Sequence, residues 1–398
     1  MTEGNLAGTG RLRAPHRRAD EPYHSRRNAC DERGPALSHA SRTALIAIAG
    51  LLTGLPLAAQ TDELVFANWR ANPISVGSRP AGMGGAFVAV ADDARAAFFN
   101  PAGLTQIPLT EISASSGRPW LSVATGRRRI RVAAYFTDGE QEPLPSPEDR
   151  PQAVLQPSVW EIGAAAGIQP FRHVRLGVSV AYRNLSIDEE GGATENPLAG
   201  ANQGRVRTTV GALIDLVPAR IVGSSPFKLG ISFQPGVSWS IPREGMSDVE
   251  LRRPSVSSVG LAWRANNSWS FSGQADVIRY HEVIDALLRN VGDEAAQDFS
   301  LVNAVEPRFG TEFATPLRCG CGTIKVRAGL HYESPGTLVF NGSDPELRDA
   351  FRVRSWRTTV TMGVSLFAEH FGNALRIDVD SRDVVNGPAL SVGAVWRF

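Results

Sequence analysis

The residues with the clearest chemical potential lie in the segment 76–108, VGSRPAGMGGAFVAVADDARAAFFNPAGLTQIP. Two adjacent acids, Asp92 and Asp93, supply carboxylates that can form ion pairs with arginines. Glycines and prolines recur along the segment, and small residues fill the space between them, so the backbone is expected to bend often and tightly. The composition predicts a compact plug of short turns, which is neither a strand ladder nor a regular helix.

The spacing within this segment suggests how it packs. Gly82, Gly84 and Gly85, which flank Met83, allow the backbone to approach a neighbouring surface closely. In the run Asn100-Pro101-Ala102-Gly103, the proline disfavours a helical conformation at Asn100, whose side chain can then cap a turn. The candidate partners of Asp92 and Asp93 are arginines on one face of later predicted strands: Arg175, Arg183, Arg207, Arg327 and Arg376.

Other reactive side chains do not combine into a catalytic or metal site. The four histidines after residue 59 are spread along the chain: His173, His281, His331 and His370. No spacing typical of Zn²⁺ ligands or of a Ser/His/Asp arrangement occurs. The run Gly77–Gly85 follows no strand and lacks the Lys–Ser/Thr pair of a phosphate-binding loop. We therefore expect a protein that is not an enzyme and that has no cofactor and no metal.

Cys319 and Cys321 are separated by one glycine in a short predicted turn. In an oxidising compartment they form either a strained disulfide or two separate thiols. Metal binding by this pair alone is not expected. The sequence leaves the choice between a disulfide and two thiols open.

The N-terminus has the organisation of a leader. Residues 1–43 carry many arginines and little apolar pattern, and Thr43–Ala59 is a short apolar run that ends in Leu-Ala-Ala. This order is typical of a secretory signal peptide, and the run is shorter than the ~20 residues of a membrane-spanning helix. We expect residues 1–59 to be removed, so that Gln60 becomes the mature N-terminus. Because this residue is not a cysteine, a lipoprotein anchor is not expected. The absence of methionine between Met1 and Met83 favours a translation start near Leu37 over a genuinely long leader.

From Glu111 to the last residue, apolar and polar side chains alternate with the period of a β-strand. The final strand shows this clearly, with one apolar face: Leu390, Val392, Ala394, Trp396 and Phe398. About fourteen strands are predicted: 111–116, 119–125, 129–137, 158–169, 175–187, 205–216, 227–241, 255–264, 269–280, 306–315, 324–332, 356–367, 374–380 and 389–398. Most have the length that a tilted strand needs to cross a bilayer.

Two further features favour a membrane barrel over a soluble sheet protein. Short turns alternate with longer polar loops such as 138–157 and 281–305, which is the pattern of outer-membrane barrels. Aromatic residues gather near strand ends, as in interfacial girdles: Trp120, Trp160, Tyr182, Trp239, Trp263, Trp269, Tyr280, Tyr332, Trp356 and Trp396. The sequence thus predicts an all-β protein, a transmembrane antiparallel β-barrel over 111–398 that follows an N-terminal segment over 60–110.

The glycine-rich motifs and the C-terminus carry a family resemblance. Gly82-Met83-Gly84-Gly85-Ala86, Val90-Ala91-Asp92-Asp93 and Asn100-Pro101-Ala102-Gly103 resemble the N-terminal hatch of FadL-type outer-membrane transporters. They are similar also to the related barrels of the PorV/PorQ type. The terminal Trp396 and Phe398 resemble the signal that the bacterial outer-membrane assembly machinery recognises. The resemblance implies a fourteen-stranded barrel whose lumen holds the hatch, residues 60–110.

The resemblance also implies a function. It suggests outer-membrane transport of hydrophobic small molecules such as long-chain fatty acids, in which the ligand binds, the hatch moves and the ligand is released into the membrane. The alternatives are a secretion-associated or protein-interacting barrel of the PorV/PorQ type and a structural or adhesive barrel. Many charges on the predicted lumen face argue against a wide apolar channel.

The expected partners follow from the same interpretation. They are the lipid bilayer of the outer membrane of a Gram-negative-type bacterium, the assembly machinery and a hydrophobic ligand, and we expect a monomer. The formal net charge of +1 gives no sign of nucleic-acid binding. One loop stands out because its apolar residues recur at helical spacing and suit ligand capture or cover of the barrel mouth: Val283, Ile284, Leu287, Leu288 and Val291.

Overall fold

A computed structural model describes most of the chain after residue 75. The described residues are 76–398 except 118, 128, 141–143, 146–153, 191–200, 218–225, 242–248, 284–297, 319–321, 335–338, 344, 346–347, 349–354, 371–372 and 386–388. The predicted leader, the first part of the hatch and the Cys319–Cys321 turn lie outside the described residues. None of the described residues belongs to a helix that is long and apolar enough to cross a membrane.

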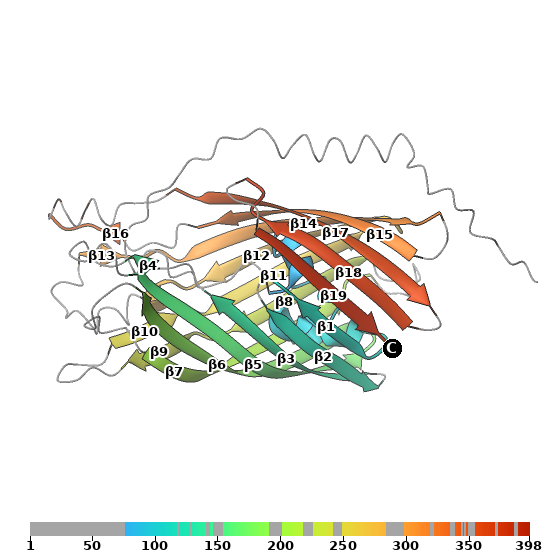
Figure 1. Cartoon of the computed structure of the whole chain (residues 1–398), viewed down its shortest axis with the longest axis horizontal. Coiled ribbons are helices and arrows are strands. Elements are labelled where there is room, and N and C mark those ends of the chain that lie inside the picture. The colour runs from blue at the N-terminus through green and yellow to red at the C-terminus, as the bar shows by residue number, and fades with distance from the viewer. Residues whose placement is uncertain are drawn as a thin grey trace, which may run out of the picture. The chain divides into compact units, whose positions relative to one another are not determined.

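Fourteen of the described strands form one closed antiparallel ring, in agreement with the sequence prediction (Figure 1). They are β1 (Glu111–Ser115), β2 (Trp120–Arg127), β3 (Ile130–Glu140), β5 (Val154–Phe171), β6 (Val174–Glu190), β7 (Ala201–Asp215), β8 (Phe227–Gln234), β11 (Val256–Arg264), β12 (Trp269–Ile278), β14 (Ala304–Pro316), β15 (Gly322–Glu333), β17 (Arg357–His370), β18 (Asn373–Arg382) and β19 (Ala389–Arg397). Each pairs with the next, and β1 pairs with β19 to close the barrel. We call the β1–β19 pairing the seam.

The remaining strands lie at the end of the barrel that carries the long loops, opposite the C-terminus (Figure 1). A two-residue strand, β4 (Leu144–Pro145), extends the sheet beside β5. Two separate ribbons are formed by β9 (Val237–Ile241) with β10 (Val249–Arg253), and by β13 (Phe299–Ser300) with β16 (Val339–Phe340).

One predicted strand is wrong in extent. The segment 227–241 is two strands, β8 and β9, separated at Pro235-Gly236. Proline has no N–H group to donate to a neighbouring strand, and glycine tolerates the bend. After the break, β9 leaves the barrel sheet and pairs with β10.

Alternation along the strands separates a lipid face from a lumen face. On β19, Leu390, Val392 and Trp396 are exposed, whereas Ser391 and Val395 are buried inside. Apolar side chains therefore face the bilayer and small or polar ones face the lumen, as expected for an outer-membrane barrel.

Three residues that we assigned to the aromatic girdle do not belong to it: Trp120, Trp239 and Tyr280. Tyr280 is buried in a cluster with Val256 and Ile278. Trp120 and Trp239 are only 2% and 1% exposed, and Trp120 lies on the lumen face of β2. Trp120 stacks on Tyr135, with ring centroids 5.0 Å apart. Position near a strand end therefore does not reveal which face a tryptophan occupies.

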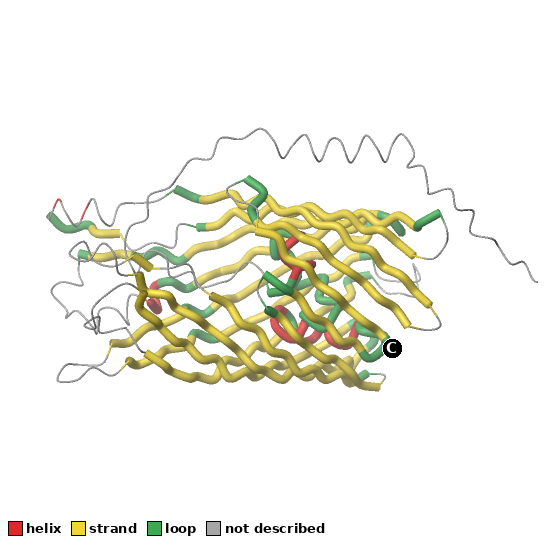
Figure 2. Tube along the Cα trace, in the orientation of Figure 1, coloured by secondary structure: helices red, strands yellow, loops and turns green. Residues whose placement is uncertain are grey.

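The hatch lies inside the ring of strands (Figure 2). Its described part contains α2 (Ser78–Gly82), α3 (Ala96–Phe99) and the 3₁₀ helix η1 (Pro101–Gln106). Phe87, Phe98 and Leu104 of the hatch belong to one buried apolar cluster with Trp120 and Tyr135 of the wall. The hydrophobic core of this barrel is thus shared between the hatch and the strands around it.

Candidate functional site

The hatch and the wall that surrounds it form the candidate site. At several positions the wall presents a glycine to the hatch, and a Cβ there would lie within 2.7 Å of a hatch atom. These glycines come from seven strands: Gly167, Gly177, Gly211, Gly230, Gly310, Gly329 and Gly393. We call them the glycine belt. Its members let the hatch backbone approach the strands more closely than any side chain would permit.

The contact of Gly84 with β15 illustrates this packing. Gly84 has φ of +61°, and its N–H donates to Thr361 Oγ1 at 2.9 Å. A Cβ on Gly329 would lie 2.1 Å from the Gly84 nitrogen, and a Cβ on Gly84 would lie 2.7 Å from the Leu330 carbonyl oxygen. Glycine is therefore required on both sides of this contact. The neighbouring Gly82, Met83 and Gly85 are also buried.

The Asn100-Pro101-Ala102-Gly103 run forms the start of η1, as the sequence predicts. Asn100 is extended, with φ of −154° and ψ of 95°, and its side chain accepts from the Ala102 N–H at 3.3 Å. Its Nδ2 donates to Val88 O at 2.9 Å and to Ala212 O on β7 at 3.0 Å. One amide side chain therefore caps η1 and joins it to another hatch turn and to the wall.

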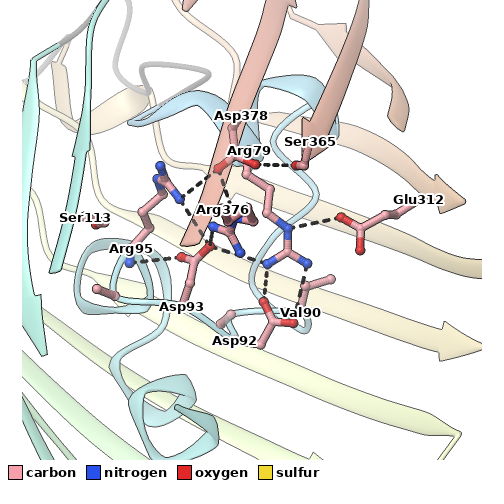
Figure 3. A network of polar contacts seen from close by, with 12 residues as sticks. Arg79, Val90, Asp92, Asp93, Arg95, Ser113, Glu312, Ser365, Arg376 and Asp378 are labelled. Atoms are coloured by element: carbon pink, nitrogen blue, oxygen red, sulfur yellow. Dashed lines mark hydrogen bonds and ion pairs between the residues drawn. The ribbon is translucent and has the colours of Figure 1, made fainter. Parts of the chain in front are cut away.

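Asp93 is the centre of a buried ion-pair network between the hatch and β18 (Figure 3). Its Oδ2 accepts from Arg376 Nη2 at 2.7 Å, from Arg95 Nη1 at 3.2 Å and from Arg79 Nη1 at 3.4 Å. Arg376 also donates to Asp378 Oδ2 at 3.0 Å, which lies 3.8 Å from Arg95 Nη1. A single carboxylate thus receives three guanidinium groups, one from the wall and two from the hatch.

Arg79 extends the network to β14. It donates to Asp92, and its Nε donates to Glu312 Oε2 at 3.2 Å (Figure 3). Glu312 in turn accepts from Lys325 and Arg327 of β15, at 2.8 and 3.0 Å. Asp92 is half-buried, unlike the fully buried Asp93.

The charges of the network determine the protonation of the hatch acids. Burial alone would raise the pKa of Asp93, but Arg95, Arg376 and Arg79 outweigh it and hold the pKa well below its usual range. Burial also opposes ionisation of Asp92, and Arg79 reverses this, so the pKa of Asp92 is lowered as well. Both carboxylates therefore remain charged at neutral pH.

Of the five arginines predicted as partners of Asp92 and Asp93, Arg376 alone makes such a contact among the described residues. The others pair with wall carboxylates: Arg175 with Asp215, Arg183 and Arg207 with Glu161, and Arg327 with Glu312, Asp378 and Asp380. The prediction was wrong for these four because acids on strands one or two places away in the barrel are nearer to them. Arg79 and Arg95, within the hatch itself, were not considered.

A second charged group lines the lumen on the opposite side. Glu161 of β5 accepts from Arg183 Nε at 2.8 Å, from Arg207 Nη2 at 2.6 Å and from the Tyr135 hydroxyl at 2.6 Å. The Arg207 guanidinium lies 4.5 Å from the centre of the Phe98 ring on α3. This cation–π contact joins the wall to the hatch without an ion pair.

The seam is also joined to the hatch. Glu111 on β1 accepts from the Ala94 N–H at 2.6 Å and from Arg397 Nε on β19 at 2.7 Å. Arg397 Nη2 further donates to Asp92 O at 3.3 Å. Next to it, Thr110 and Phe398 exchange two backbone hydrogen bonds. Phe398 and Trp396, the predicted assembly signal, are exposed on the lipid face.

The predicted ligand-capture loop is described only at its start. Residues 281–283 are helical, with Val283 half-buried, and Ile284, Leu287, Leu288 and Val291 lie outside the described residues. Glu282 attaches this turn to the β10–β11 corner, since it accepts from Ser255 Oγ at 2.7 Å and from Arg252 Nη2 at 3.2 Å. In the part of the chain that the structure describes, no group of His, Cys, Asp and Glu side chains could hold a metal ion.

Comparisons with known proteins identify the fold. A Pseudomonas aeruginosa FadL homologue matches with a TM-score of 0.53 and 10% sequence identity over 84% of this chain and 98% of that chain. The Pseudomonas putida toluene transporter TodX gives 0.53 and 12% over 82% and 98%. The CymD monoaromatic hydrocarbon channel gives 0.52 and 13% over 82% and 98%. No protein-family model and no curated protein sequence matches. On this structural evidence the chain has the fold of FadL-type barrels.

Proposed function

We propose that this protein is an outer-membrane channel for hydrophobic small molecules. The observation that carries the proposal is a fourteen-stranded barrel around an interior hatch, in a fold that it shares with a FadL homologue and with toluene and monoaromatic hydrocarbon channels. The apolar lipid face and the exposed Trp396 and Phe398 support placement in the outer membrane by its assembly machinery.

Apolar residues at the loop end of the lumen support a hydrophobic ligand. Leu185 on β6, Val256 on β11 and Ile278 on β12 are buried there, on the lumen side of their strands. Trp239 of the β9–β10 ribbon is buried as well. A hydrophobic ligand that enters between the loops would meet these side chains before it reaches the hatch. Long-chain fatty acids are one ligand class that we propose.

The height of the wall supports release of the ligand into the membrane. On the loop side, β2 begins at Trp120, which pairs with Thr137, and Thr137 pairs with Glu161. Strand β5, which pairs with β3, continues beyond that level to Val154. The wall is therefore lower at the β1–β2 hairpin than at β5, and a ligand held near the hatch has a shorter way to the bilayer there.

Uptake measurements test the proposal. Cells that express the protein in the outer membrane, and lack their own channels for these compounds, should take up radiolabelled toluene or oleate faster than cells with an empty vector. Uptake of oleate and not toluene would identify fatty acids as the ligand class, and the reverse would identify monoaromatic compounds. Equal uptake with and without the protein, for both probes, would contradict the proposal.

The two ribbons favour a second candidate, a secretion-associated or protein-interacting barrel. The β9–β10 and β13–β16 ribbons lie beyond the ring of barrel strands at the loop end, where a protein partner could pair with an edge strand (Figure 1). Deletion of the gene in its own bacterium would then remove specific proteins from the cell surface. Unchanged surface proteins together with lost hydrocarbon uptake would exclude this candidate.

A further inference from the structure

The wall holds the two halves of the hatch by different kinds of contact. The first half, residues 78–95, includes α2, and ion pairs attach it to the wall. Asp93 pairs with Arg376 at 2.7 Å, and Arg79 pairs with Glu312 at 3.2 Å. Backbone N–H groups of this half donate to wall side chains as well: Gly84 to Thr361, Phe87 and Val88 to Gln274, and Ala94 to Glu111.

The second half, residues 96–106, comprises α3 and η1. In each of its described contacts with the wall, at least one of the two partners is uncharged. Asn100 Nδ2 donates to Ala212 O at 3.0 Å, and Lys228 donates to Gln106. Phe98 packs against Arg207 and the wall aromatics. In the described part of the chain, no ion pair joins this half to a strand. Its last residues, Thr105 and Gln106, are half-buried, unlike α2.

The two kinds of contact differ in how much it costs to break them. Separating a buried ion pair leaves an uncompensated charge in a water-poor environment, which is strongly unfavourable. Breaking a single neutral hydrogen bond costs much less, particularly where water can replace it. Local opening is favoured where hydrogen bonds are open to solvent, and Thr105 and Gln106 at the end of η1 are half-buried. The electrostatic cost of opening the hatch is therefore lower at η1 than at α2.

We infer that the hatch opens on one side, with 78–95 fixed to β1, β12, β14, β17 and β18 and α3–η1 moving away from β5–β8. Asn100, in the moving half, links the two halves, since its Nδ2 donates to Val88 O of the fixed half. The passage past the hatch would then run between η1 and the glycine belt members of β5, β6 and β7, whereas a ligand released over the low β1–β2 edge would bypass it. The inference rests on the proposed transport function, because it names the path that the same ligand takes.

Disulfide locks on the two sides test this inference. A Cβ on Gly393 would lie 3.3 Å from Ser78 Cβ, close to the Cβ–Cβ spacing of a disulfide. A Cβ on Gly167 would lie 3.3 Å from Thr105 Cγ2, the position that the sulfur of a cysteine at 105 would take. Ser78→Cys with Gly393→Cys locks the fixed half, and Thr105→Cys with Gly167→Cys locks η1. Both pairs are made with Cys319→Ser and Cys321→Ser. A Cβ on Gly167 would also lie 2.7 Å from Pro101 O, so the substitution itself disturbs the packing. Each oxidised lock is therefore compared with its own reduced form, which carries the same substitutions.

Uptake of toluene or oleate per folded barrel is the readout. The η1 lock should reduce uptake to the vector background when oxidised, and a reductant should restore it. The Ser78–Gly393 lock should leave uptake within about twofold of its reduced form. Loss of uptake with both locks would overturn the inference in favour of movement of the whole hatch. Persistence of uptake with both locks would show that the ligand does not pass the hatch.

Hydrogen exchange tests the same motion without transport. In the purified wild-type barrel, amides of 98–107 should exchange at least about tenfold faster than those of 79–95. Equal protection of the two halves would contradict one-sided opening even if uptake is observed. Faster exchange at η1 with no uptake of either probe would instead contradict the proposed function and leave the asymmetry of the hatch established.

Discussion

Glu111 and Arg397 face each other across the seam of the barrel, with Glu111 Oε2 2.7 Å from Arg397 Nε. The same carboxylate accepts from the Ala94 N–H of the hatch. The first strand, the last strand and the hatch therefore meet at one side chain. The seam has only five residue pairs, so this contact contributes more to closure there than it would between long strands.

Substitution Glu111→Gln should weaken closure of the barrel. The amide keeps one hydrogen-bond acceptor but loses the charge that Arg397 requires, and we expect a loss of about 2 kcal/mol in the free energy of unfolding. Urea titration, followed by the shift between folded and unfolded bands on unheated gels, measures this loss. Asp215→Asn is the matched control, because Asp215 pairs with Arg175 at 2.9 Å away from the seam. A larger loss in the control would contradict the proposed importance of the seam contact.

The two hatch acids should differ sharply in their effect on stability. Asp93→Asn leaves three guanidinium groups without their shared carboxylate, and removing one partner of a buried pair costs about 3–5 kcal/mol. Asp92→Asn removes a partly exposed carboxylate, and Arg79 keeps Asp93 and Glu312 as partners, so we expect a loss of only about 1 kcal/mol. Thermal unfolding of the two purified variants distinguishes them. Similar losses would mean that the network does not depend on Asp93.

Acid should weaken the stabilisation of the hatch by Asp93 only at low pH. Because the pKa of Asp93 is lower in the folded protein than in the unfolded chain, its stabilisation is complete above the unfolded value of about 3.9. The stabilisation is lost as pH falls from there toward the folded pKa. The difference in unfolding free energy between wild type and Asp93→Asn should thus be constant from pH 7 to pH 5 and shrink below about pH 4. A difference that already falls between pH 7 and pH 5 would contradict this assignment.

The barrel could be predicted from the sequence because its signal is local. Each strand must show apolar residues to lipid at every second position, so the pattern is visible without knowledge of the neighbouring strands. The break between β8 and β9 was missed because alternation continues through Pro235-Gly236. The lumen position of Trp120 and the burial of Trp239 were missed because an aromatic ring satisfies the pattern on either face.

The long-range contacts of the hatch were less predictable than its local turns. The cap formed by Asn100 depends on the next two residues, and it was predicted. The ion pairs between Asp93 and Arg376 and between Arg79 and Glu312 join residues more than 200 positions apart, and their choice depends on strand order and register. One signal was present but not used, namely glycines at lumen positions of several strands, such as Gly177 and Gly329.

The glycine belt provides the last prediction. Gly329→Ala places a methyl group 2.1 Å from the Gly84 nitrogen and 2.3 Å from the Met83 carbonyl carbon, so the hatch backbone must shift. Overpacking of this kind costs about 1–3 kcal/mol. Gly273→Ala on β12 is the matched control, because its methyl group would meet only the Phe309 ring, at 3.8 Å. Thermal unfolding of both variants should show a clear loss for Gly329→Ala and almost none for Gly273→Ala. If both behave alike, the wall does not require glycine where the hatch touches it, and the close approach of the two backbones is not what holds the hatch in place.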